Sequence, residues 1–176
     1  MNENDTVMIE IRKEQAEDRD AIHQLNTIAF DNGPEAALVD KLRISCKDYL
    51  SFVAVEDGSV IGHILFTPAN MDDNSVDGMG LAPMAVLPSH QGEGIGSRLV
   101  RYGLDYLRET GCPFVIVLGH PDYYPRFGFE LASKYQIHSQ WEGVPDDAFM
   151  IAVFDREVLP KHGGVARYRD EFDEAM

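Results

Sequence analysis

The sequence predicts an α/β (α+β) fold, a mixed sheet with helices on both faces, and three patterns lead to it. Residues 52–55 and 60–66 are apolar runs on either side of Asp57–Gly58, a pair that supplies the positive backbone angles of a tight antiparallel hairpin. Residues 113–119 are continuously apolar, which is typical of a strand covered on both faces. Segments with helical periodicity lie between these strands, so helices and sheet are expected to share one core.

The other elements are predicted from the spacing of their apolar residues. Strict alternation favours a strand, and an apolar stripe at helical spacing favours an amphipathic helix. Residues 81–87 are apolar but contain Pro83, which cannot donate a ladder hydrogen bond, so we expect an edge strand or a bulge there. In chain order we predict a strand at 7–12, helices at 14–30 and from Pro34 onward, a loop at 71–78, a helix after Gly96 and a strand at 149–154. The inner sides of the first two helices are predicted to carry Ala16, Ile22, Leu25, Ile28, Ala29, Ala37, Leu38 and Leu42.

Length and composition limit the class of protein. With 176 residues, of which 44% are hydrophobic, the chain predicts a single domain at 1–176, with a core at about 7–154 and a C-terminal extension at 155–176. The 15 basic and 30 acidic residues give a net charge of −15, which disfavours nucleic-acid binding. Apolar stretches are too short for a membrane span and the acidic N-terminus does not resemble a signal peptide, so we expect no membrane contact and a cytoplasmic location. His120 and Asp122 lack a third partner at ligand spacing, so no metal is expected.

A glycine-rich turn carries the clearest chemical signal. An apolar strand ends at Pro88, and Gly92, Gly94 and Gly96 then stand at alternate positions before a helix. Glycines ahead of a helix leave backbone N–H groups uncovered, and the helix end adds partial positive charge, so a phosphate can bind there even in an acidic protein. The helix has an apolar side made of Ile95, Leu99, Leu104 and Leu107.

Spacing alone leaves the ligand of this turn open. A dinucleotide-binding fingerprint needs a glycine three residues beyond Gly94, where Ser97 stands, and no Gly-Lys-Ser/Thr triplet provides a Walker A loop. The alternatives that remain are a phosphate-bearing ligand and a turn whose glycines are purely structural.

Two motifs together resemble a known family. Gln91-x-x-Gly94-x-Gly96, preceded by Val86-x-Pro88, resembles the acyl-CoA signature of the GNAT superfamily of N-acetyltransferases. Downstream, Tyr124-Pro125-Arg126-Phe127-Gly128-Phe129 resembles the second signature of that family, a tyrosine four residues before a Gly-Phe pair. The order of elements is also similar over roughly residues 7–154. The resemblance implies a mixed, mostly antiparallel central sheet and transfer of an acetyl group from acetyl-CoA to an amine.

The resemblance also implies how acetyl-CoA would bind. Backbone groups of Met84, Ala85 and Val86 would pair with the pantetheine arm as an added strand would. A main-chain N–H near Val86 or Leu87 would polarise the thioester carbonyl. The pyrophosphate would be held by the turn formed by Gln91, Gly92, Glu93, Gly94, Ile95, Gly96 and Ser97.

A tyrosine would protonate the departing CoA thiolate. The resemblance assigns this general-acid role to Tyr124, because a thiolate accepts a proton readily at neutral pH. Pro121 and Pro125 flank the tyrosines, so the short helix of the family must be truncated here, and Tyr123 is the alternative acid. The family often has an asparagine after the buried strand, a position where this chain has Gly119 and His120.

An amine must also lose a proton before it attacks. His63, in the second hairpin strand, is the candidate base, although a lone histidine in an apolar strand is more often a hydrogen-bonded core residue. The other options are Glu56, His120, Asp122 and a water chain with no dedicated base.

The acceptor is expected to be a primary amine of a small molecule or peptide. Its site is expected at the first two helices, at residues 71–78 and at residues 135–144, which include Trp141. An aromatic-rich segment beside carboxylates suits a cationic amine, and the alternative is a solvated acidic surface anchored by Trp141. Exposed sheet edges in the C-terminal half would allow a homodimer. The alternative function is a non-catalytic acyl-CoA-binding sensor or interaction module on the same fold.

Overall fold

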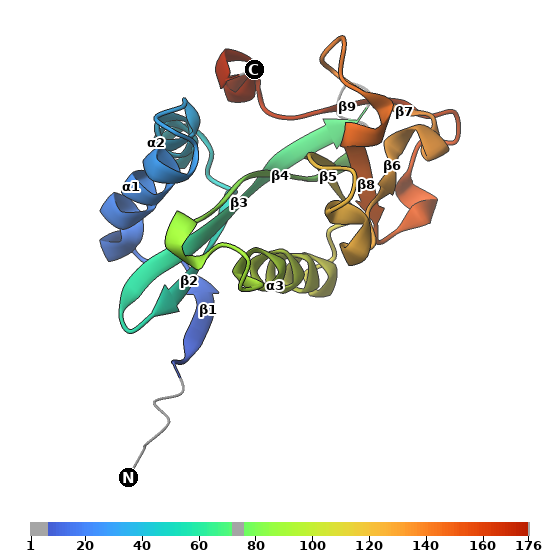
Figure 1. The fold of residues 1–176 in the computed structure, drawn as a ribbon. Coiled ribbons are helices and arrows are strands. Elements are labelled where there is room, and N and C mark those ends of the chain that lie inside the picture. The colour runs from blue at the N-terminus through green and yellow to red at the C-terminus, as the bar shows by residue number, and fades with distance from the viewer. Residues whose placement is uncertain (1–6, 72–75, 176) are drawn as a thin grey trace.

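The computed structural model describes residues 7–71 and 76–175. In this part of the chain nine strands form one mixed, mostly antiparallel sheet, as predicted (Figure 1). Their order is β1-β2-β3-β4-β5-β8-β6, and β9 pairs with β3 and β7 beside this path. The β4–β5 and β7–β9 pairs are parallel, and the other pairs are antiparallel. The strands are β1 (Ile9–Lys13), β2 (Leu50–Glu56), β3 (Ser59–Met71), β4 (Val76–Val86), β5 (Phe114–Leu118), β6 (Glu130–Leu131), β7 (Ile137–Ser139), β8 (Phe149–Val153) and β9 (Gly164–Arg167).

Helices cover both faces of the sheet. α1 and α2 lie together on one face and α3 lies on the other (Figure 1). Side chains alternate along β2, so Val53 and Val55 pack in the cluster under α1 and α2, whereas Phe52 and Ala54 pack in the cluster under α3. None of the described helices is long and apolar enough to cross a membrane. The helices are α1 (Arg19–Ala29), α2 (Glu35–Ser45) and α3 (Ile95–Glu109).

The first helix begins later than predicted, at Arg19 rather than near residue 14. Asp18 is buried, and its carboxylate accepts hydrogen bonds from the Arg12 guanidinium at 2.6 Å and 3.0 Å and from the backbone N–H of Gln15 at 2.7 Å. These bonds hold the preceding residues in a separate 3-10 turn, so the helical periodicity read from the sequence extends too far toward the N-terminus.

Three residues predicted on inner helix faces are exposed instead. Ala16 is exposed in the 3-10 turn before α1, Ile28 is 55% exposed, and Ala37 is exposed while Ala36 takes the inner position on α2. The buried stripe of α2 therefore starts one residue earlier than the sequence suggested. Ala29 is half-buried, and the other residues predicted to face inward, Ile22, Leu25, Leu38 and Leu42, are buried.

The hairpin is confirmed, and its neighbouring strands are longer than predicted. Asp57 and Gly58 have φ of 49° and 80°, as a tight turn between β2 and β3 requires. The prediction of a loop at 71–78 is wrong at its described ends, because Met71 pairs with Val76 and Ala69 pairs with Gly78. Residues 72–75 lie outside the described part of the chain.

The irregularity predicted at Pro83 is a bulge within the sheet. Between the pairs Ile64–Met84 and Phe66–Leu81, β4 contains one more residue than β3. Because β4 lies between β3 and β5, it is not an edge strand. The proline is tolerated at a position where regular pairing is already interrupted.

Residues 164–175 pack into the molecule. β9 pairs with the end of β3 through Asn70–Arg167 and Met71–Ala166, and a 3-10 turn, η7 (Asp170–Ala175), follows it. Tyr168 and Phe172 are buried in the cluster on the α1–α2 face. The segment that the sequence suggested as an extension therefore shares the core of the protein.

Candidate active site

The site is organised by a fork between β4 and β5. These parallel strands pair at Met79–Leu81 and Val115–Val117. Beyond that point β4 continues to Val86 along β3, whereas β5 ends at Leu118. The bulge lies at the point of divergence, so the side of β4 that faces away from β3 has no strand partner among the described residues after Leu81. An extended ligand can pair with such a strand.

Tyr168 from the C-terminal segment fixes the base of this fork. Its hydroxyl donates toward the carbonyl oxygens of Leu81 at 3.0 Å and Ile116 at 3.2 Å, one from each strand. The ring lies directly against Gly80, where a Cβ would clash with it. Burial raises the pKa of the Tyr168 phenol above its usual range, so the hydroxyl keeps the proton with which it bridges the two strands.

The first of two cavities at the fork is formed by the glycine turn, and we call it the glycine-loop cavity. It has a volume of about 500 Å³. Gly92 and Gly94 have φ of 81° and 82°, a region that favours glycine, and Gly94 precedes α3 with no side-chain cap. The N–H groups of the first turn of α3 are therefore open toward an anion. The cavity is lined by Met84, Val86, His90, Gln91, Gly92, Gly94, Ile95, Gly96, Ser97, Tyr123 and Arg126.

Most of the residues predicted to bind acetyl-CoA are thus brought together. Two predicted residues, Ala85 and Glu93, do not line the cavity. Ala85 is buried opposite His63 in the β3–β4 ladder, and Glu93 is exposed on the turn. The side chain of Gln91 donates to the carbonyl of Val86 at 3.1 Å, which ties the turn to the end of β4.

Arg126 is a residue of this cavity that sequence reasoning missed. Its Nε donates to the carbonyl of Tyr123 at 2.9 Å, and its guanidinium lies 4.8 Å from the centre of the Tyr123 ring. It adds a positive charge to the described lining of this cavity, beside the main-chain N–H groups of the turn. The feature of the sequence that could have indicated Arg126 is its position as the single basic residue within the Tyr124–Phe129 motif.

The two candidate acids are separated by the fold. Tyr123 lines the glycine-loop cavity, and its hydroxyl lies 3.4 Å from that of Ser97. Tyr124 lines the second cavity, is 8% exposed, and packs against Gly119, where a Cβ would clash with its ring. Burial, with a smaller effect of Tyr123, raises the pKa of Tyr124 above its usual range. The tyrosines stand at the start of a 3-10 turn, η3 (Tyr124–Phe127), in place of a longer helix, as the flanking prolines predict.

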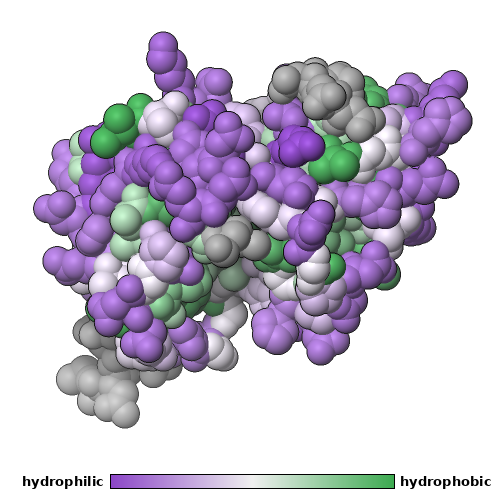
Figure 2. Space-filling model, turned by 90° about the horizontal axis from the view of Figure 1, so that it is seen from above, coloured by the Kyte–Doolittle hydropathy of each residue, from purple (hydrophilic) through white to green (hydrophobic). Residues whose placement is uncertain are grey.

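The second cavity is mostly apolar, and we call it the aromatic cavity. It has a volume of about 270 Å³. Figure 2 looks down on this side of the molecule, where pale and green residues gather around a hollow between the α1–α2 half and the half that carries β8. The lining residues are Phe30, Glu35, Leu38, Leu81, Ala82, Pro83, Met84, Leu118, Tyr124, Trp141, Tyr168, Phe172 and Ala175.

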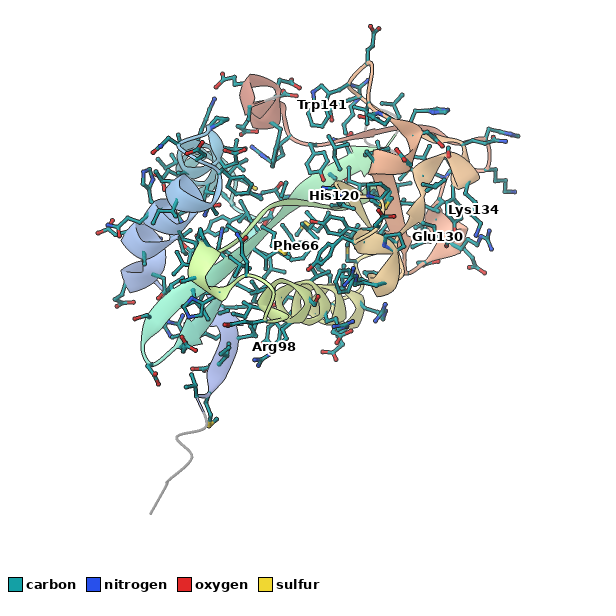
Figure 3. All side chains as sticks on the ribbon, in the orientation of Figure 1. Phe66, Arg98, His120, Glu130, Lys134 and Trp141 are labelled. Carbon is teal, nitrogen blue, oxygen red and sulfur yellow. The ribbon has the colours of Figure 1, made fainter. Side chains whose placement is uncertain are left out.

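The aromatic cavity agrees in part with the predicted acceptor site. Glu35 and Leu38 come from α2, and Phe30 directly follows α1. Trp141 is also present, beside the C-terminal turn (Figure 3). The described part of residues 71–78 contributes nothing. Sequence reasoning missed the contribution of residues 168–175, because no periodicity placed that segment beside the helices.

The structure does not bring His63 to either cavity. Its side chain is fully buried, with Nε2 at 2.9 Å from the Ser51 hydroxyl and Nδ1 at 3.2 Å from the Asn26 amide. Burial, with a smaller effect of the Arg43 charge, lowers the pKa of His63 from 6.5 to about 3. His63 is therefore a neutral core residue on β3, and we do not retain it as the base.

The other candidate bases also lie outside the aromatic cavity. Glu56 contacts His90 at 2.7 Å, and His120 and Asp122 are exposed beyond the end of β5 (Figure 3).

Cys112 is partly buried, its thiol donates to the carbonyl of Phe114, and burial raises its pKa. No group of three or more potential metal ligands is found among the described residues.

Comparisons with known proteins agree with this geometry. The family model "Acetyltransferase (GNAT) family" matches residues 19–129. The uncharacterized N-acetyltransferase YhbS of Escherichia coli K12 is 35% identical over 164 residues, which cover 93% of this chain and 98% of YhbS. The crystal structure of E. coli YhbS in complex with CoA has a TM-score of 0.90, with 33% identity and coverage of 98% of this chain and 96% of the other.

A second solved structure shows the same likeness. The GNAT family acetyltransferase from Brucella melitensis, in complex with acetyl-CoA, has a TM-score of 0.79 and 36% identity, and the match covers 94% of this chain and 99% of that one. The family match spans the glycine turn, the fork and the tyrosine motif, and the two structures share the fold that places them. The chain therefore belongs to the acetyltransferase (GNAT) family and is a GNAT N-acetyltransferase.

Proposed function

We propose that this protein transfers an acetyl group from acetyl-CoA directly to a primary amine, with both substrates bound at once. The observation that carries the proposal is that Met84, at the fork, lines both cavities. A coenzyme with its pyrophosphate at the first turn of α3 and its pantetheine arm along residues 84–86 would bring its thioester to this shared point. The CoA and acetyl-CoA bound by the two related crystal structures support the choice of donor.

Direct transfer accounts for every bond and proton in the reaction without a covalent enzyme intermediate. The amine, once neutral, attacks the thioester carbonyl through its nitrogen, a C–N bond forms, and the C–S bond breaks. The thiolate takes one proton, and the nitrogen releases one, so the products are an N-acetyl amine and free CoA. A main-chain N–H near Val86 would stabilise the oxyanion that forms during the attack.

Tyr124 is the proposed proton donor to the thiolate. Its place in the aromatic cavity, which Met84 also lines, supports this role, and its raised pKa keeps the phenol protonated at neutral and mildly alkaline pH. Tyr123 contacts Ser97 at the coenzyme side, which suits a role in binding. The two roles predict different kinetic consequences for the two Tyr→Phe variants.

Thiol release from acetyl-CoA across a panel of primary amines tests the proposal. We expect release above the hydrolysis background with at least one amine, and a lower rate for Tyr124→Phe. Tight CoA binding by calorimetry without thiol release from any amine would instead favour a sensor or interaction module on the same fold.

A further inference from the structure

The aromatic cavity contains one formally charged residue among the described residues that line it, Glu35. The Oε2 atom of its carboxylate is buried and has no hydrogen-bond partner among the described residues. A buried carboxylate oxygen without a partner destabilises a protein, because the water it has lost is not replaced. Glu35 has no hydrogen-bond or ion-pair partner among the described residues, so its negative charge at the cavity wall favours a cationic ligand.

The chain between α1 and α2 places this carboxylate. Asp31 and Asn32 have φ of 51° and 62°, so the backbone reverses sharply before Pro34 and Glu35 opens α2. The carboxylate packs against Gly33, where a Cβ would clash with Oε2. Because Glu35 is in the first turn of the helix, its backbone is fixed by α2, and the side chain is held at the wall of the cavity.

Aromatic rings also line the cavity. The indole N–H of Trp141 donates to the carboxylate of Asp173 at 2.8 Å, so the ring is oriented by η7 and its N–H is already satisfied. The Trp141 ring stacks on Tyr168 with centroids 5.6 Å apart, and Tyr168 contacts Phe172 with centroids 4.9 Å apart. Such a wall suits a flat apolar group, and aromatic faces also attract cations.

The described lining of the cavity contains no cationic side chain. No lysine or arginine is among these residues, so a ligand carboxylate would have no opposite charge to pair with and would lie in the same cavity as Glu35. A volume of about 270 Å³ fits a small molecule rather than a folded chain.

We propose that the acceptor is an arylalkyl primary amine without a carboxylate, whose ammonium group is bound by Glu35 and whose ring packs on the wall formed by Trp141, Tyr168 and Phe172. The inference rests on the proposed acetyl transfer for its kinetic test, but the binding of the amine does not require turnover. Glu35 is thus a specificity-determining residue for the acceptor.

Three amines separate the contributions of charge and ring. 2-Phenylethylamine has the ring and the ammonium group, phenylalanine adds a carboxylate, and 1,5-diaminopentane lacks the ring. We expect kcat/KM for thiol release with 2-phenylethylamine to exceed that with each of the others by about tenfold or more, the usual effect of one charge-assisted hydrogen bond or one buried ring. Glu35→Gln should reduce the preference over phenylalanine about tenfold, whereas Glu109→Gln, an exposed carboxylate at the end of α3, should leave it unchanged.

Trp141 provides a second readout that is independent of catalysis. It is the one tryptophan of the sequence and it lines the cavity, so its fluorescence should change when 2-phenylethylamine binds in the presence of CoA. We expect a Kd about tenfold higher for Glu35→Gln and unchanged for Glu109→Gln.

The outcomes distinguish the two proposals. Equal kcat/KM for the three amines, with no effect of Glu35→Gln, would overturn the acceptor assignment and leave acetyl transfer intact. No thiol release from any amine, together with a Glu35-dependent fluorescence change, would overturn acetyl transfer and support the cavity assignment. Absence of any fluorescence change with 2-phenylethylamine would overturn the acceptor assignment irrespective of turnover.

Discussion

The buried His63 makes a quantitative prediction about stability in acid. In the folded protein its pKa is lowered to about 3, chiefly by burial, whereas the unfolded chain should have the ordinary value of 6.5. Between these values the unfolded state binds a proton that the folded state does not, so the stabilising contribution present above pH 6.5 is lost as the pH falls toward 3. At about 1.4 kcal/mol per pH unit, lowering the pH from 6.5 to 5 should destabilise the fold by about 2 kcal/mol through this group.

Urea unfolding at pH 8 and pH 5 measures this effect, and His63→Gln is the matched variant. Carboxylates such as Asp18 and Glu171, whose pKa values are lowered by ion pairing, titrate in both proteins and cancel in the comparison. We expect the wild type to lose about 2 kcal/mol more than the variant between the two pH values. Equal losses would refute the argument from burial, and a loss of turnover of about a hundredfold or more at pH 8 with the fold intact would restore His63 as a catalytic base.

Four further predictions concern the site. Tyr124→Phe should lower thiol release about a hundredfold with an unchanged calorimetric Kd for CoA, and an equal loss in Tyr123→Phe would assign the acid to the other ring. Because the pKa of Tyr124 is raised, turnover at saturating amine should not decline between pH 8 and about pH 10 through ionisation of this phenol; a decline there that Tyr124→Phe lacks would contradict the assignment. Gly94→Val should weaken CoA binding severely, since a side chain at φ of 82° is strained and stands at the open turn of α3, and unchanged affinity would count against the loop as the coenzyme site. Tyr168→Phe should lower the free energy of unfolding by about 1–3 kcal/mol, measured in urea, because two buried carbonyls lose their donor, and an unchanged midpoint would show that the hydroxyl does not hold the fork.

The parts of the fold that sequence predicted are those fixed by local chemistry. The Asp57–Gly58 hairpin, the bulge at Pro83 and the helix after the glycine turn each depend on a backbone requirement of one or two residues. The glycine turn was recognisable for the same reason, since glycine at positive φ and an uncapped helix start are properties of a short segment.

The aromatic cavity was not predictable to the same degree because it is assembled from distant segments. Glu35 and Trp141 are brought together by tertiary packing, and residues 168–175 reach them after β9 joins the sheet. The burial of His63 likewise depends on contacts with Asn26 and Ser51 that local periodicity cannot show. Its position on a strand was readable from the sequence, but its burial beneath α1, outside both cavities, was not.

The Tyr168 bridge has a consequence for the order in which the protein matures. Leu81 and Ile116, whose carbonyls accept these bonds, are synthesised long before Tyr168. A growing chain that emerges from the ribosome therefore lacks the hydroxyl that joins the two diverging strands. The described residues that line the glycine-loop cavity all precede Tyr168 in the chain. In contrast, Tyr168, Phe172 and Ala175, which belong to this late segment, line the aromatic cavity. The described residues that line the glycine-loop cavity are therefore all synthesised before the part of the aromatic cavity formed by Tyr168, Phe172 and Ala175.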